Sequence, residues 1–142
     1  MDAQALDFWL GEWDCTWDGG SGTNAITRDL GDAVIVERFE AIEPDRWSGM
    51  SVSVFDPSSG WRQTWVDSNG SYWHFHGTLV DGDLAFATLG PVDADATLKR
   101  MVFSAVTPAG FDWRWERSPD GESWEPRWAI AYRRKGVAPP SA

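Results

Sequence analysis

Two histidines and one glutamate are the residues of this chain best suited to acid–base chemistry. His74 and His76 are separated by one residue, so on a β-strand their imidazoles point to the same side. That spacing also occurs in metal sites, but with no further histidine a third ligand must be Glu37 or Asp67. We therefore predict no metal. The histidines are interpreted as proton donors and acceptors, as hydrogen-bond partners of a ligand, or as structural or surface residues.

Glu37 alternates with Ile35 and Phe39 along a predicted strand, so the three side chains share one face. A carboxyl group among apolar residues has a raised pKa, as catalytic acids often do. In one alternative, Glu37 forms an ion pair with an arginine. In another, the strand is turned the other way, so that Val34 and Val36 point inward and Glu37 points outward. Glu37, His74 and His76 are the candidate catalytic residues if the protein is an enzyme.

The dipeptide Asn69-Gly70 predicts a two-residue type I′ turn, which would fix the register of the flanking strands. Trp65 would then lie opposite His74, and Gln63 opposite His76. One face of this hairpin would carry Trp61, Gln63, Trp65, Asp67, Tyr72, His74 and His76, and the other Arg62, Thr64, Val66, Trp73, Phe75 and Leu79. The first set mixes aromatic and hydrogen-bonding groups, as ligand pockets do. In the alternative, that set lies outside, and Trp73 and Phe75 enter the core.

Tryptophan is unusually frequent, with 11 in 142 residues. Large cavities, aromatic ligands and interfaces use such side chains, whereas a compact core rarely needs so many. Alternation predicts that Trp113, Trp115, Trp124 and Trp128 point inward from two adjacent strands. The predicted ligand-binding residues are Gln63, Trp65, Asp67, Tyr72, Trp113, Trp115 and Trp128.

Turn signals such as Asp81-Gly82 recur about every 10 to 13 residues, which leaves no room for crossover helices. They delimit ten predicted strands, at roughly 12–18, 23–29, 33–42, 47–55, 61–68, 71–80, 83–89, 97–107, 110–117 and 123–134. One apolar face per strand indicates a closed barrel or a sandwich. We predict an all-β fold, a single antiparallel up-and-down barrel of about eight to ten strands. The pattern of residues 2–10 predicts about two turns of helix before the barrel.

Five segments, in this order, resemble the bacterial calycin-like family known as domain of unknown function 1579. They are Phe8-Trp9-Leu10-Gly11-Glu12-Trp13, Val36-Glu37-Arg38-Phe39-Glu40, Phe55-Asp56-Pro57-Ser58-Ser59-Gly60, Thr64-Trp65-Val66-Asp67-Ser68 and Ala131-Tyr132-Arg133-Arg134. The resemblance implies an antiparallel barrel with a central cavity, and it implies no particular activity. Gly11 and Trp13 are also similar to the opening motif of lipocalins, in which the tryptophan plugs the barrel base under an arginine. Arg133 or Arg134 could take that part. The related nitrobindin-like barrels hold haem through a histidine near the C-terminus, and this chain has none there.

The net charge and the composition of the chain argue against several classes of function. A formal net charge of −10 argues against nucleic acid and anionic membrane surfaces as partners. A single cysteine allows no intrachain disulfide, and the first residues carry no signal-peptide pattern, so we expect a cytoplasmic protein. We expect one domain over residues 1–135, a disordered tail over 136–142, and no cofactor.

Three functions fit these observations. The first is a binding module for a small, largely apolar or aromatic molecule. The second is a cofactor-independent isomerase, cyclase or hydrolase that uses Glu37, His74 and His76 as acid and base. The third is an interaction domain whose surplus tryptophans support self-association, for example as a homodimer.

Overall fold

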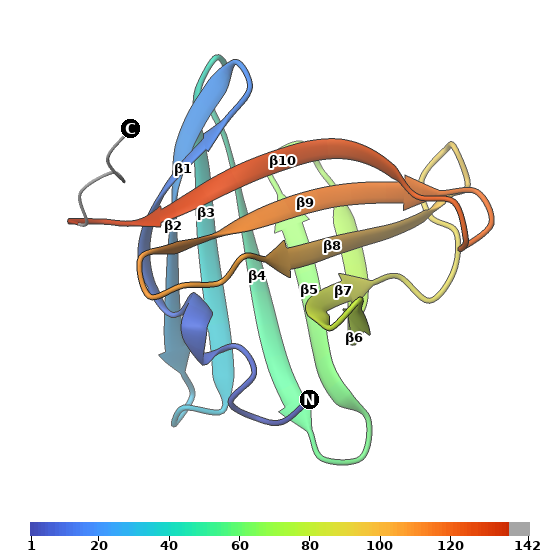
Figure 1. Cartoon of the computed structure of the whole chain (residues 1–142), viewed down its shortest axis with the longest axis horizontal. Coiled ribbons are helices and arrows are strands. Elements are labelled where there is room, and N and C mark those ends of the chain that lie inside the picture. The colour runs from blue at the N-terminus through green and yellow to red at the C-terminus, as the bar shows by residue number, and fades with distance from the viewer. Residues whose placement is uncertain (137–142) are drawn as a thin grey trace.

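Ten antiparallel strands form a single closed barrel in the computed structural model, which describes residues 1–136 (Figure 1). Each strand pairs with its neighbours in sequence, and the last strand pairs with the first. The strands are β1 (Gly11–Trp17), β2 (Gly20–Asp29), β3 (Val34–Glu43), β4 (Trp47–Asp56), β5 (Gly60–Asp67), β6 (Tyr72–Val80), β7 (Asp83–Ala87), β8 (Leu98–Ser104), β9 (Gly110–Ser118) and β10 (Glu125–Arg134). The predicted barrel is confirmed, and each predicted strand overlaps an observed one. Of the predicted tail, residues 137–142 lie outside the described residues.

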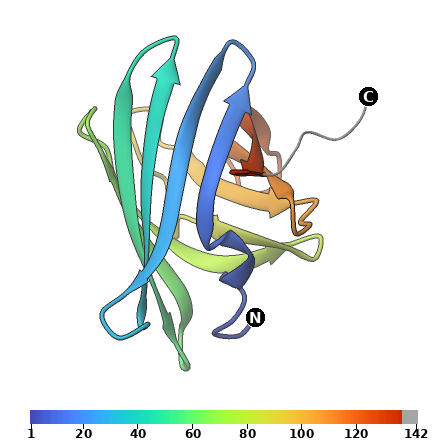
Figure 2. The same ribbon diagram turned by 90° about the vertical axis from the view of Figure 1, so that its left-hand side faces the viewer.

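The N-terminal segment forms one 3-10 turn, η1 (Asp7–Trp9), instead of the predicted two turns of α-helix. Leu6 and Trp9 are both buried, and residues three apart lie above one another in a 3-10 helix. Leu10 is already extended (φ −61°, ψ 137°) and leads into β1, which ends the helical segment at Trp9. Figure 2 shows this turn beside the start of β1. No helix within residues 1–136 is long and apolar enough to cross a membrane.

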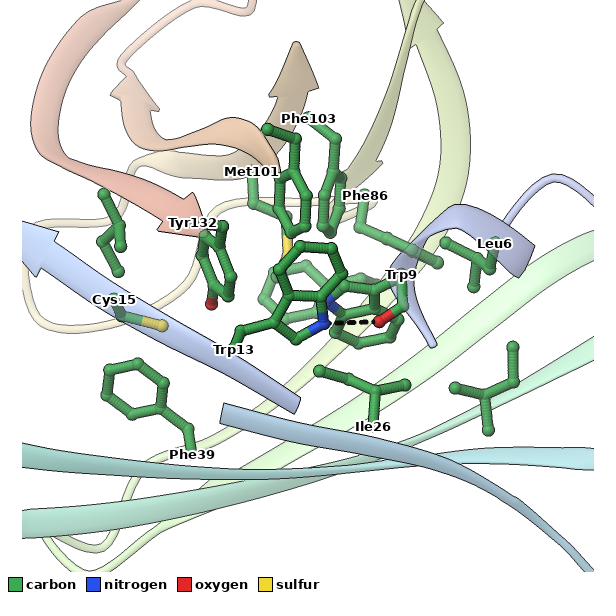
Figure 3. Close-up of a cluster of buried hydrophobic side chains, with 14 of the residues drawn as sticks. Leu6, Trp9, Trp13, Cys15, Ile26, Phe39, Phe86, Met101, Phe103 and Tyr132 are labelled. Carbon is green, nitrogen blue, oxygen red and sulfur yellow. Dashed lines mark hydrogen bonds between the residues drawn. The ribbon is translucent and has the colours of Figure 1, made fainter. Parts of the chain in front are cut away.

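The end of the barrel that holds η1, here called the base, is closed by aromatic packing (Figure 3). Trp13 is fully buried, and its indole N–H donates to the Trp9 carbonyl at 2.8 Å. The Arg134 guanidinium lies 4.2 Å from the centre of the Trp13 ring. It also donates to the carbonyls of Leu10 at 2.8 Å and Phe8 at 3.3 Å. Arg133 and Arg134 were both candidates for the arginine that covers Trp13. Arg134 is the one that does so.

The hairpin between β5 and β6 does not have the register that Asn69-Gly70 predicts. Val66 lies opposite Tyr72, so five residues, 67–71, separate the paired positions. The Asp67 carboxylate accepts hydrogen bonds from the backbone N–H groups of Asn69 at 3.0 Å and Ser71 at 3.1 Å. An aspartate that caps its own turn in this way stabilises a longer loop, and here it outweighs the Asn-Gly signal.

The corrected register moves β6 by one residue relative to β5 and therefore reverses its faces. Trp65 lies opposite Trp73, and Gln63 opposite Phe75, all four on the inner face. Thr64 lies opposite His74, and both residues are on the outer face. The predicted face of β5 is thus correct, whereas the predicted face of β6 is wrong.

Trp124 does not share the inner face with Trp128, because β10 has an irregularity between Pro126 and Trp128. One extra residue in a strand exchanges the two faces beyond it. Trp128 lies opposite Trp115 inside the barrel, while the Arg100 guanidinium lies 3.9 Å from the centre of the Trp124 ring. Arg100 belongs to the outer row with Glu116, which identifies Trp124 as an outer side chain.

Candidate functional site

The barrel encloses a cavity of about 130 Å³ toward the end opposite the base, here called the mouth. A dry apolar cavity of roughly 150 Å³ is large enough for benzene, so this volume suits about one small ring. Six of the eleven tryptophans line it. The lining residues are Glu37, Phe39, Trp47, Trp65, Asp67, Trp73, Met101, Trp113, Trp115, Trp128, Ile130 and Tyr132.

A single cross-strand row positions one wall of the cavity. Glu37 on β3 lies opposite Ser51 on β4, which lies opposite Trp65 on β5, which lies opposite Trp73 on β6. Directly opposed residues on one face have Cβ atoms about 5 Å apart, so neighbours in the row lie side by side. The row brings a carboxyl group, a hydroxyl group and two indoles to the same level of the barrel.

The Trp65 indole is fixed from two directions. Gly49 leaves the space that the ring occupies, because a Cβ at this position would lie 2.2 Å from the ring atom Cζ2. The indole N–H donates to the Asp67 carboxylate at 2.9 Å. That carboxylate also caps the loop at 67–71, so one side chain sets both the strand register and the orientation of Trp65.

The remaining walls are indole rings in two orientations. Trp113 and Trp115 are almost parallel, at 5°, and Trp73 stacks on Trp115 with ring centres 4.8 Å apart. Trp128 stands at 86° to Trp113, with ring centres 5.5 Å apart. Such edge-to-face pairs are favourable arrangements of aromatic quadrupoles. The tryptophans thus hold one another in place and leave the cavity between them.

Glu37 provides the deepest charged group of the cavity. The Ser51 hydroxyl donates to Oε1 at 2.7 Å, and the Asn24 side-chain N–H donates to Oε2 at 2.7 Å. Burial raises the pKa of this carboxyl, and the hydrogen bonds from Asn24 and Ser51 oppose the shift. No basic side chain within residues 1–136 lies in ion-pair distance of Glu37.

Tyr132 and Cys15 complete this buried polar group. Asn24 also donates to the Tyr132 hydroxyl at 2.9 Å, and that hydroxyl contacts the Cys15 thiol. Burial raises the pKa of the Cys15 thiol and that of the Tyr132 hydroxyl far above neutral pH. Both groups are therefore uncharged, and the thiol is not a nucleophile.

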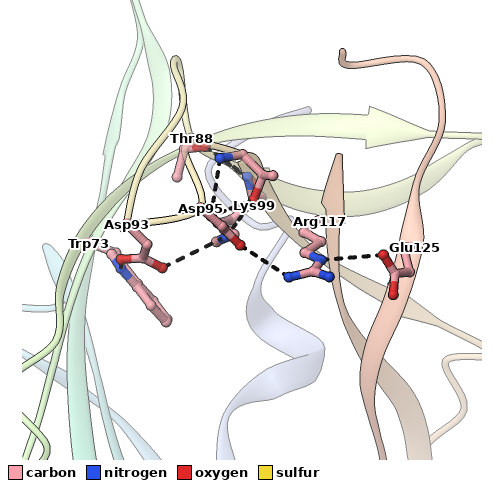
Figure 4. Close-up of polar contacts among 8 residues, drawn as sticks. Trp73, Thr88, Asp93, Asp95, Lys99, Arg117 and Glu125 are labelled. Carbon is pink, nitrogen blue, oxygen red and sulfur yellow. Dashed lines mark hydrogen bonds and ion pairs between the residues drawn. The ribbon is translucent and has the colours of Figure 1, made fainter. Parts of the chain in front are cut away.

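A rim of ion pairs lies beside the cavity, in the segment that joins β7 to β8 (Figure 4). The Lys99 ammonium is buried and contacts Asp95 at 2.9 Å. Asp95 also pairs with Arg117 at 3.2 Å, and the Trp73 indole donates to Asp93 at 3.1 Å. This segment, which lies between the strands predicted at 83–89 and 97–107, therefore connects a cavity tryptophan to the ends of β8 and β9.

Six predicted site residues line the cavity: Glu37, Trp65, Asp67, Trp113, Trp115 and Trp128. Four others lie elsewhere. Gln63 is buried closer to the base and donates to Ser53 at 3.0 Å. Tyr72 is 71% exposed, and His74 and His76 belong to the outer face of β6. Neither histidine therefore joins Glu37 and Trp65 in the cavity, because the observed register of the hairpin places both imidazoles on the outer face.

Sequence reasoning missed several lining residues, chiefly Trp47, Trp73, Met101 and Ile130. It also missed the two donors to Glu37, Asn24 and Ser51. The sequence shows that Trp73 and Phe75 share one face of their strand. The predicted hairpin register placed that face opposite the one assigned to the pocket. The described chain contains no group of three histidine, cysteine, aspartate or glutamate side chains arranged to hold a metal ion.

Comparisons with known proteins show the fold alone. No protein-family model matches the chain, and the search of curated proteins returned no match. Among solved structures, the chain is similar to a protein described as a de novo design of a fluorescence-activating beta barrel. The TM-score is 0.50 at 15% sequence identity, over 95% of this chain and 100% of the designed one.

Proposed function

We propose that this protein binds one small, largely apolar or aromatic molecule in the tryptophan-lined cavity. The observation that carries the proposal is the cavity wall itself, in which six indoles surround two carboxylates. Ligand sites combine an apolar, aromatic lining with a few polar groups that fix orientation. Because the base is closed, the mouth is the entrance for a ligand. Trp47, Asp67 and Trp73 lie there, at the strand ends.

The proposal is tested by the tryptophan emission of the protein with indole, naphthalene and trimethylphenylammonium, corrected for absorption by the compound. We expect saturable quenching by at least one of them. Trp128→Ala should raise its Kd about tenfold, since truncating a central aromatic contact costs more than about 1 kcal/mol. Trp124→Ala is the matched control, because Trp124 lies on the outer face. Emission that stays unchanged with all three compounds would remove the main support for binding.

A cofactor-independent enzyme is a second candidate, and Glu37 is the observation that favours it. A buried carboxyl of raised pKa in a cavity is suited to proton transfer. The histidines do not contribute, since they lie outside the cavity. In this case Glu37→Gln would lower turnover of a substrate by about 10²–10⁴ and leave its affinity nearly unchanged. A change in affinity with no turnover to lose would favour the binding module.

Self-association is a third candidate, because the outer face of β4–β6 carries exposed apolar side chains. Val52, Val66 and Tyr72 are 42%, 37% and 71% exposed, and Val66 lies opposite Tyr72. An exposed apolar patch often marks an interface. Light scattering would show a homodimer that Val52→Lys with Val66→Lys disrupts, whereas Leu30→Lys, in an exposed turn, leaves it intact. A monomer at all concentrations would exclude this candidate.

A further inference from the structure

The charged groups that line the cavity are all acidic. Glu37 lies within it, and Asp67 lies near the mouth at the end of β5. Within residues 1–136, no lysine, arginine or histidine lines the cavity. A ligand that enters therefore meets negative charge or neutral dipoles, and a positive ligand has two partners available.

The Glu37 carboxylate has capacity for a further partner. Ser51 and Asn24 supply one hydrogen bond each, whereas an ionised carboxylate offers about four lone-pair sites. The other titratable groups of the same cluster, Cys15 and Tyr132, are uncharged at neutral pH and supply no positive charge. A buried carboxylate without a counter-charge is costly, and a cation beside it would offset that cost.

The cavity walls also suit a cation. The face of an indole attracts a positive group through its quadrupole, and tryptophan is the best aromatic residue for this contact. Trp113 and Trp128 are nearly perpendicular, and Trp115 is parallel to Trp113, so the indoles offer surfaces in more than one direction. Walls of this kind form the aromatic cages that recognise quaternary ammonium groups.

Basic side chains beside the mouth do not oppose this assignment. Lys99 is paired with Asp93 and Asp95, and Arg117 with Asp95 and Glu125 (Figure 4). Arg127, the first basic residue of β10, also pairs with Glu125. Each of these three basic side chains thus has a carboxylate partner, so they add no uncompensated positive charge beside the cavity.

We infer that the ligand of this cavity is a small organic cation, an alkylated ammonium attached to an apolar or aromatic body, with Glu37 as its counter-ion. The inference rests on the proposed binding function and specifies the chemical class of its ligand. The ammonium group lies against the indole faces within reach of Glu37, and the apolar body extends toward Trp47 and Asp67 at the mouth.

Binding of the cation is coupled to release of a proton. In the free protein, burial holds the pKa of Glu37 above its ordinary value of 4.5, so at pH 4.5 more than half of the molecules carry the protonated carboxyl. A positive ligand favours the ionised form and thereby displaces that proton. A neutral ligand of the same shape has no such preference.

The test compares trimethylphenylammonium with tert-butylbenzene, which has the same shape and no charge. Calorimetry in two buffers of different ionisation heat gives the affinity and the number of protons released. We expect the cation to bind at least about tenfold more tightly than the neutral compound and to release protons at pH 4.5. Glu37→Gln should abolish this preference. Glu40→Gln, an equal charge change on the outer face of β3, should keep it.

The outcomes separate the two proposals. If tert-butylbenzene binds as tightly as the cation, the cation inference is overturned and the binding function stands. If the preference survives in Glu37→Gln, Glu37 is not the counter-ion and the inference is also overturned. If neither compound binds the wild-type protein, the cation inference is overturned, and the binding function fails as well only if indole and naphthalene also leave the emission unchanged. Should Glu37→Gln not fold, the wild-type affinities and the proton release still decide.

Discussion

Gly49 on β4 lies directly beneath the Trp65 indole on β5, with space for the ring only because Gly49 has no side chain. This contact and the hydrogen bond that the same indole donates to Asp67 together set the orientation of one cavity wall. Figure 1 shows that the two strands are adjacent in the barrel. The cavity therefore depends on a residue that contributes no lining atom of its own.

Gly49→Ala should displace the Trp65 indole and weaken ligand binding at least about tenfold. Its overpacking cost should be about 1–3 kcal/mol in the free energy of unfolding. Denaturant unfolding and a fluorescence titration measure the two effects. Gly90→Ala is the matched control, because nothing lies within 4 Å of a Cβ built at that position. Unchanged affinity in Gly49→Ala would show that Trp65 does not form part of the site.

Glu37 should make a measurable contribution to the pH dependence of stability. Its folded-state pKa lies above the ordinary value of 4.5, so the folded protein holds this proton more tightly than the unfolded chain does. The stability that this proton confers is complete below pH 4.5 and is lost as pH rises through the folded-state pKa. Urea unfolding of wild type and Glu37→Gln across pH 4 to 8 isolates this contribution. Parallel curves for the two proteins over that range would contradict the raised pKa.

Two tryptophans that look equivalent in the sequence should differ in their effect on stability. Trp13 is fully buried in the base, so Trp13→Ala should cost about 3–5 kcal/mol in the free energy of unfolding. Trp128 is only half-buried and borders the cavity, so Trp128→Ala should cost about 1–2 kcal/mol. Chemical denaturation measures both. Equal costs would mean that the mouth is as tightly packed as the base.

Arg134 should stabilise the base through its hydrogen bonds more than through its charge. It donates to the carbonyls of Phe8, Leu10 and Pro108, so Arg134→Ala should lower the free energy of unfolding by about 2–4 kcal/mol. Arg134→Lys should recover only part, since an ammonium cannot reproduce the planar array of donors. The neighbouring Arg133, which alternates with the inward Tyr132 and so points outward, provides the control Arg133→Ala. Full recovery in the lysine variant would assign the effect to charge.

The barrel itself could be predicted from sequence because it depends on patterns that repeat in every strand. Alternation places Trp13 with Cys15, and Trp113 with Trp115, on the inner face, and frequent turn signals exclude crossover helices. Glu37 could be placed inward with Ile35 and Phe39 for the same reason. These predictions need no knowledge of register between strands.

The parts of the site that depend on register could not be predicted in the same way. The Asp67 side chain extends the loop after β5 by capping backbone N–H groups, and this moves His74 outside and Trp73 inside. An irregularity in β10 likewise moves Trp124 outside. Each change exchanges the two faces of a strand through a local shift of one residue. The alternation of inward and outward residues along a strand does not show where such shifts occur.

A ligand site inside the barrel is tested most directly by the NMR spectrum of the indole N–H groups, recorded while indole or trimethylphenylammonium is added to the protein. We expect the signals of cavity tryptophans such as Trp65, Trp113 and Trp128 to shift during the titration. Signals of Trp9 and Trp13 in the closed base should remain in place. Shifts confined to Trp124 on the outer face, or no shift with either compound, would contradict a ligand site inside the barrel.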